Sequence, residues 1–111
     1  MNNEKDLKEV YKNNEDIEAK EFNVNYPGDG IKVRIFDLNK GLIEYEHVKL
    51  VRIVSDTYNL LIMQDYLPII GEIHGNVDIR NEELDLSFRN IEAFYMNCNN
   101  VFNLMIREYN E

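Results

Sequence analysis

The sequence is poor in cysteine, proline and glycine, and it has no long hydrophobic run. Its 111 residues include one cysteine, two prolines and five glycines. Because Cys98 has no second cysteine to pair with, a disulfide-stapled secreted scaffold is excluded and a reducing compartment is favoured. The longest apolar run, Leu60 to Met63, is too short to cross a bilayer. The start, Met-Asn-Asn-Glu-Lys, is not typical of a signal peptide, so we expect a cytoplasmic protein without direct membrane insertion.

Basic residues are scarce as well. The chain has 12 Lys and Arg against 21 Asp and Glu, which gives a net charge of −9 at pH 7. This charge disfavours a groove for nucleic-acid phosphates, so no nucleic-acid partner is expected. A protein partner, particularly a basic one, suits the charge better. The length and the 44% apolar content indicate one globular domain with appendages.

The N-terminal segment differs in composition from the rest of the chain. The first 22 residues hold seven acidic and four basic side chains. Leu7, Val10 and Tyr11 are three and four residues apart, which is typical of one helix face, but isolated helices of about three turns are marginal in water. Two interpretations stay open: a short helix or a solvated charged arm. We place this arm at residues 1–28, where a Pro-Gly-Asp-Gly turn closes it, and the folded domain at residues 29–111.

From Ile31 onward, apolar and polar residues alternate in short runs separated by turn-forming residues. Ile31, Val33 and Ile35 would share one face of a strand while Lys32 lies on the other, which is the two-residue period of a half-buried strand. The same analysis predicts strands over residues 31–36, 42–46, 48–54, 58–63, 69–73, 76–79, 84–88, 93–96 and 101–106. Many short strands with close turns predict a mainly β fold, an antiparallel sandwich or barrel.

Six consecutive segments carry a resemblance to a known family. They are Lys-Val-Arg-Ile-Phe-Asp at 32–37, Gly-Leu-Ile-Glu-Tyr-Glu at 41–46, Val-Lys-Leu-Val-Arg-Ile-Val at 48–54, Leu-Leu-Ile-Met-Gln-Asp-Tyr-Leu-Pro-Ile-Ile at 60–70, Gly-Asn-Val-Asp-Ile at 75–79 and Asn-Asn-Val-Phe-Asn-Leu-Met at 99–105. In order and spacing, residues 31–105 resemble the N-terminal β-sandwich domain of the epsilon subunit of F-type ATP synthases. The resemblance implies an antiparallel β-sandwich without a catalytic site of its own.

The chain departs from this family where the family has a glycine-rich segment. Residues 58–68 contain no glycine, and Asp65, Tyr66 and Leu67 stand where the family usually has Gly, His and Ala, while Pro68 is retained. Without glycine the loop loses residues with free φ, which predicts another backbone path and a bulkier apolar surface. The family's C-terminal helical hairpin has no counterpart after Glu111, so we expect no inhibition of ATP hydrolysis of the usual kind.

The resemblance implies a central-stalk subunit of a rotary F1-type or F1-like ATPase that binds a gamma-like subunit and other subunits of the complex. In the family the loop corresponding to residues 63–70 faces gamma and the membrane rotor ring, which would hold the protein at the inner face of the cell membrane. Tyr66 and Leu67 are the first expected contacts. The predicted interface comprises Asp56, Tyr58, Met63, Asp65, Tyr66, Leu67 and Pro68. The alternative is a stand-alone β-sandwich adaptor or regulatory protein, because a fold alone does not settle a function.

No residue pattern points to catalysis, a cofactor or a metal ion. His47 and His74 are the only histidines, and neither has cysteine or carboxylate neighbours at the spacing of a zinc site. We expect His74 to be a partly buried histidine at a strand end. Glu82, Glu83 and Asp85 alternate with leucines at the start of a predicted strand, which places them on a solvated face. We therefore expect a non-catalytic binding protein.

Overall fold

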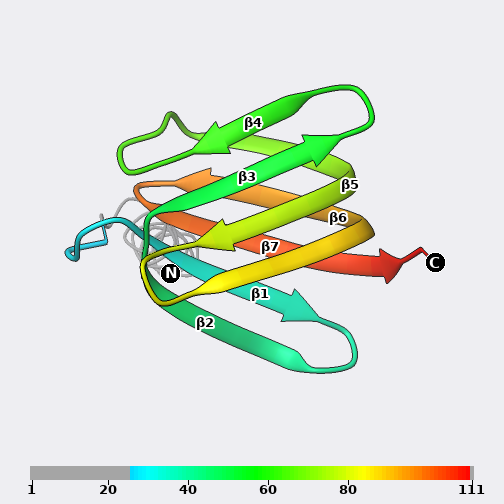
Figure 1. The fold of residues 1–111 in the computed structure, drawn as a ribbon, viewed down its shortest axis with the longest axis horizontal. Coiled ribbons are helices and arrows are strands. Elements are labelled where there is room, and N and C mark those ends of the chain that lie inside the picture. Colours follow the sequence, from blue (N-terminus) through cyan, green and yellow to red (C-terminus); the bar gives the residue numbers. More distant parts are fainter. Residues whose placement is uncertain (1–25, 111) are drawn as a thin grey trace, which may run out of the picture.

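The protein folds into seven β-strands, as shown by a computed structural model that describes residues 26–110 (Figure 1). The strands are β1 (Ile31–Asp37), β2 (Gly41–Val48), β3 (Leu50–Ser55), β4 (Asn59–Ile62), β5 (Ile69–Arg80), β6 (Asp85–Cys98) and β7 (Val101–Tyr109). A mainly β fold is therefore confirmed. The N-terminal helix or arm predicted before Tyr26 lies outside the described residues. Within residues 26–110, no helix has the length and apolar character that a membrane crossing requires.

All seven strands belong to one sheet, in the order β2-β1-β7-β6-β5-β3-β4. Five of the six neighbouring pairs are antiparallel, as expected. The sixth pair, β1 and β7, is parallel, with Ile35 opposite Leu104. This pair differs from the predicted antiparallel arrangement because alternation of apolar residues reports which face is buried and not the direction of the neighbouring strand.

Two pairs of predicted strands are each one long, bent strand. Predicted strands 69–73 and 76–79 form β5, while 84–88 and 93–96 form β6. Gly75, Arg89 and Asn90, which indicated turns, lie instead at one irregularity of the β5–β6 ladder, where the register shifts between Gly75 and Val77. A second shift, between Glu92 and Ala93, lies in the β6–β7 ladder. Such bulges bend a strand without ending it. Figure 1 shows β5 and β6 bending together, so that the single sheet folds back over itself in a sandwich-like arrangement.

The apolar core lies on the inward face of this folded sheet. The predicted inward residues of β1, Ile31, Val33 and Ile35, are 0 to 1% exposed. Tyr95 on β6 and Phe102 on β7 are the largest fully buried side chains, and their ring centroids are 5.7 Å apart in a stacked arrangement. Full burial of one such apolar side chain contributes about 1.5–3 kcal/mol, so the core is the main source of stability.

The bend in β5 depends on a glycine that has no room for a side chain. Gly75 pairs with Ser55 on β3, and a Cβ built on Gly75 would lie 2.1 Å from the Val54 backbone oxygen. The backbone N–H of His74 donates to Ser55 Oγ at 3.0 Å, which holds the two strands together at this point. Any larger residue would therefore push β3 away from β5.

We expect Gly75→Ala to lower the free energy of unfolding by about 3 kcal/mol, because its methyl group would overlap backbone atoms that cannot rotate away. Gly41→Ala is the matched control. Gly41 has a φ of +81 but open space around its Cβ position, so only the backbone strain of about 1–2 kcal/mol applies. Urea unfolding followed by circular dichroism measures both, and an equal loss in the two variants would contradict the close-packing account.

A hydrogen-bonded carboxylate joins the end of β1 to the end of β7. Asp37 is buried, its Oδ1 accepts the Asn39 backbone N–H at 2.8 Å, and its Oδ2 accepts the Tyr109 hydroxyl at 2.8 Å. The bond from Asn39, followed by that from Tyr109, lowers the pKa of Asp37 below its ordinary value of 3.8. Burial, with the neighbouring Asp37, raises the pKa of Tyr109 to about 12. The charged form of Asp37 is therefore the one that the fold stabilises.

We expect Asp37→Asn to lower the free energy of unfolding at pH 7 by about 1–2 kcal/mol through loss of charge-assisted hydrogen bonds. The folded-state pKa is lowered, so the contribution of Asp37 is complete above the ordinary value of 3.8 and disappears as the pH falls through the folded-state pKa. Urea titrations from pH 7 to pH 2 should therefore show the wild type and the variant converging in acid. Asp29→Asn, at an exposed aspartate, should show no such convergence.

Candidate functional site

The loop of residues 63–68 joins β4 to β5 and contains five of the seven predicted interface residues. It is tied to the turn between β6 and β7. The Asp65 backbone N–H donates to Asn100 Oδ1 at 2.6 Å, and Asn100 Nδ2 donates to Asp65 Oδ1 at 3.1 Å. A further bond runs from Asn97 Nδ2 to the Leu67 backbone oxygen at 3.4 Å. The loop is therefore held in one conformation by two asparagines that are themselves buried.

Asp65 adopts a backbone conformation that glycine usually adopts, in a loop that contains no glycine. Its φ is 66, in the left-handed region that glycine adopts most readily. Aspartate and asparagine tolerate this region better than other side chains do, and the bonds to Asn100 stabilise it here. Asp65 therefore supplies a left-handed residue in a loop that contains no glycine.

The tip of the loop presents apolar side chains to solvent. Leu67 is 75% exposed, Met63 is 50% exposed, and Pro68 is also exposed. Ile70, just after the loop at the start of β5, is 77% exposed. An exposed apolar cluster on a rigid loop is a typical contact surface for another protein, because its burial on binding costs little ordering entropy.

The two tyrosines of the predicted interface have a different placement. Tyr58 and Tyr66 are half-buried and pack against the core. The Tyr58 hydroxyl donates to the Glu72 backbone oxygen and lies 3.4 Å from the Tyr95 hydroxyl. Burial, followed by the hydrogen bond with Tyr58, raises the pKa of Tyr95, so Tyr95 stays neutral. Tyr58 and Tyr66 thus pack toward the core and offer less surface to a partner than Leu67 does.

Asp56 lies apart from the rest of the predicted interface. It belongs to the turn between β3 and β4, where its backbone N–H donates to the His74 oxygen at 3.1 Å. Met63 follows the other end of β4, so the strand separates the two (Figure 1). The structure therefore brings together residues 63–68 but not Asp56 with them, because a hairpin strand carries its two flanking loops at opposite ends.

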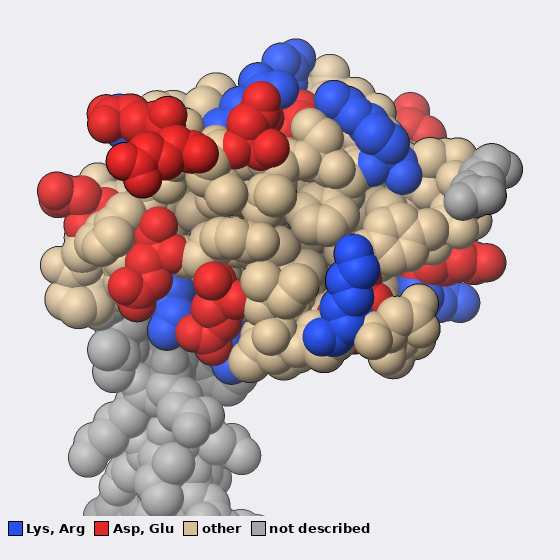
Figure 2. Space-filling view, turned by 60° about the horizontal axis from the view of Figure 1, so that its bottom comes forward, with Lys and Arg blue, Asp and Glu red and all other residues tan. Residues whose placement is uncertain are grey.

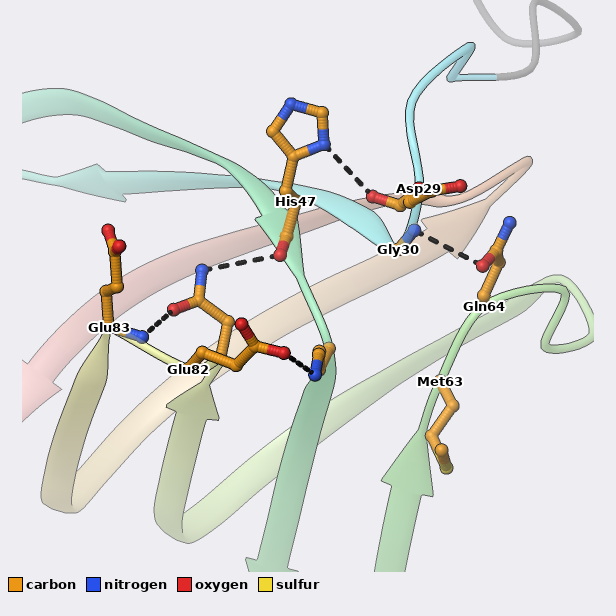
Figure 3. Close-up of a pocket in the computed structure, with 9 residues that line it drawn as sticks. Asp29, Gly30, His47, Met63, Gln64, Glu82 and Glu83 are labelled. Carbon is orange, nitrogen blue, oxygen red and sulfur yellow. Dashed lines mark hydrogen bonds and ion pairs between the residues drawn. The ribbon is translucent and has the colours of Figure 1, made fainter.

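Met63 and Gln64 also border a polar pocket of about 530 Å³ that the sequence did not indicate (Figure 3). Its remaining lining comes from the turn before β1, from the end of β2 and the residue after it, and from the turn between β5 and β6: Asp29, Gly30, His47, Lys49, Asn81, Glu82 and Glu83. Figure 3 shows Gln64 and Met63 on one side, Glu82 and Glu83 on the other, and His47 between them. These loops are distant in the sequence, so only the folded sheet brings them together.

Hydrogen bonds close the wall of this polar pocket. Gly30 donates its backbone N–H to Gln64 Oε1 at 3.2 Å, and Asn81 Nδ2 donates to the His47 backbone oxygen at 3.3 Å. Gly30 has a φ of +79, and a Cβ there would lie 2.4 Å from the Val48 oxygen, so the close approach requires glycine. The His47 ring nitrogen Nδ1 lies 3.2 Å from the Asp29 backbone oxygen.

The charged groups of the polar pocket are already paired or solvated. Lys49 forms an ion pair with Glu82 and so lowers the pKa of that carboxyl. Glu82, Glu83 and Asp85 are exposed, as the alternation with leucines predicted. Among the described residues, no group of three or more His, Cys, Asp or Glu side chains is arranged to hold a metal ion. The pocket can bind a small polar group by hydrogen bonds and charge.

His74 differs from the sequence-based expectation. It lies in the middle of β5 with a side chain that is 47% exposed, and its Nδ1 is 3.4 Å from Glu92 Oε1 on β6. The expectation of a partly buried strand-end histidine was wrong because Gly75 marks a bend rather than the end of the strand. His74 is therefore a surface residue paired across two strands.

No protein-family model matches the sequence, and no curated protein sequence matches it. The function is therefore inferred from the residues of the chain itself. The most distinctive surface feature among the predicted site residues is the anchored apolar loop from Met63 to Pro68.

We expect Asn100→Gly to release this loop, because glycine keeps the left-handed backbone of Asn100, whose φ is 63, while it removes the side-chain amide. Loss of these bonds should lower the free energy of unfolding by about 1–2 kcal/mol. Amide hydrogen exchange should accelerate at Gln64 to Leu67. Asn90→Gly, at another left-handed asparagine, is the control and should leave exchange in the loop unchanged.

Proposed function

We propose that this protein is a non-catalytic, epsilon-like subunit of the central stalk of a rotary F1-type or F1-like ATPase. In this role it binds a gamma-like subunit and turns with it, and its contribution is mechanical coupling through a packed interface. The observation that carries the proposal is the exposed apolar tip of the loop at Met63, Leu67 and Pro68, held on a rigid support at the position where the resembling family meets its partners.

Two further features support the proposal. Each of the six segments that carry the resemblance contributes residues to at least one strand. The charge of −9 suits a basic partner, and acidic side chains gather toward one end of the face in Figure 2, with uncharged surface beside them. Acidic groups on the protein surface would attract a basic partner and help to orient it.

A second candidate function is a stand-alone adaptor or regulatory protein that binds a small polar ligand. The polar pocket of about 530 Å³ favours it, because its lining combines a lysine, a histidine and several carboxylates. Such a protein would not co-purify with subunits of an ATPase.

The test is affinity purification of the full chain from its native cells, with the bound proteins identified by mass spectrometry. Recovery of gamma-like and catalytic ATPase subunits is expected. Leu67→Glu should reduce that recovery by at least about tenfold, because a charged group at a central apolar contact typically costs 2 kcal/mol or more. Leu38→Glu, at a leucine that is 86% exposed in the turn between β1 and β2, is the matched control and should leave recovery unchanged. Recovery without any ATPase subunit would refute the proposal.

A further inference from the structure

An apolar groove of about 550 Å³ lies on the outward face of the sheet, across β1, β7, β6 and β5. Met105 on β7 stands opposite both Phe36 on β1 and Phe94 on β6, so three large side chains form one row across the strands. They are 37 to 45% exposed. The outward face of a sheet that covers a core with its other face is usually polar, so this row points to a binding surface.

One end of the groove is polar. Arg34 on β1 lies opposite Asn103 on β7, and Asn103 lies opposite Met96 on β6. Ile70 continues this row on β5, where it pairs with Met96. Among the described residues that line the groove, Arg34 is the only charged one. The lining therefore offers a cation and an amide at one end and apolar side chains at the other.

The cation at the polar end belongs to a cluster with an excess positive charge. The Arg34 guanidinium lies 5.3 Å from the centre of the Phe36 ring, which is a cation–π contact. Glu44 Oε1 lies 3.4 Å from Arg34 Nε, and Glu44 Oε2 lies 3.4 Å from Lys32 Nζ. One carboxylate is thus shared between two cations. A guanidinium has five N–H donors, which exceed what one carboxylate oxygen can accept, so Arg34 can bind a second carboxylate.

We propose that this groove binds a small amphipathic carboxylate. The carboxylate would lie at Arg34 and Asn103, and its apolar chain or ring would lie along Phe36, Met105 and Phe94. The volume falls in the range of about 300–1,000 Å³ that is typical of small-molecule sites, which are mostly apolar with a few polar groups that fix orientation. The proposal does not depend on the central-stalk role, because the ligand would occupy the sheet face and not the loop of residues 63–68.

Charge favours this occupant over two others. A cationic amphiphile would meet Arg34 as a like charge. A second copy of the chain fits less well, because both copies carry a charge of −9. That net charge does not prevent the binding of one small anion, because the field of distant exposed carboxylates is screened beyond about 8 Å at physiological ionic strength.

Calorimetric titration of the full-length protein with sodium decanoate and with decyltrimethylammonium tests the proposal. The two probes share an apolar chain and differ in the sign of the head group. Below their micellar concentrations, decanoate should bind at least about tenfold more tightly than the cation. Arg34→Gln should weaken the binding of decanoate by about tenfold without weakening that of the cation. Arg52→Gln, which removes the same charge from an exposed position on β3 outside the groove, is the matched control and should leave both affinities unchanged.

The methionine methyl groups report where the probe binds. Met96 and Met105 line the groove, whereas Met63 lines the polar pocket together with Lys49. In protein labelled with carbon-13 at the methionine methyl groups, decanoate should shift the resonances of Met96 and Met105 and leave that of Met63 unchanged.

The proposal is supported by saturable binding of decanoate that depends on Arg34 and moves both groove methyl groups. Absence of saturable binding, equal affinity for the two probes, or an equal loss in Arg34→Gln and Arg52→Gln would overturn it. A shift at Met63 in place of the groove methionines would put the anion at Lys49 and refute the assignment as well. A decanoate affinity that falls as the protein concentration rises would show that a second copy covers the groove, which is also incompatible with the proposal.

Discussion

The fold depends on two long neighbouring strands bending at the same place. β5 and β6 pair along almost their whole length, so neither can bend unless the other does. Gly75 allows the close approach of β3 at the bend, and Asn90, with a φ of 54, gives β6 the matching change of direction. Because of this shared bend, one continuous sheet covers the core from both sides, and the loops at its ends converge on the polar pocket and the loop of residues 63–68.

Much of this architecture could be predicted from alternation alone. The inward residues of β1 were recognisable because Ile31, Val33 and Ile35 are apolar while Lys32 and Arg34 between them are charged. The continuity of β5 and β6 was not predictable, because Gly75 and Asn90 occur equally well in turns and in bulges. The parallel pairing of β1 with β7 was hidden for another reason. It joins segments that are far apart in the chain, and no local pattern encodes a partner.

The candidate site was predictable in its position and less so in its geometry. The missing glycines drew attention to the loop that ends at Pro68, and the exposure of Leu67 agrees with a contact role that remains a prediction. The half-burial of Tyr66 could not be seen, since an aromatic residue suits a core and an interface equally well. The groove around Phe94 and Met105 was missed because its members come from four strands whose order only the fold defines.

The parallel pairing of β1 with β7 affects how the chain folds while it is being synthesised. β1 is the first described strand to leave the ribosome and β7 is the last, yet they are neighbours in the finished sheet. The hairpin of β1 and β2 can form early, but the second edge of β1 stays unpaired until β7 has been synthesised. An unpaired strand edge can pair with another chain, so the sheet is protected from such pairing only when the last strand is in place.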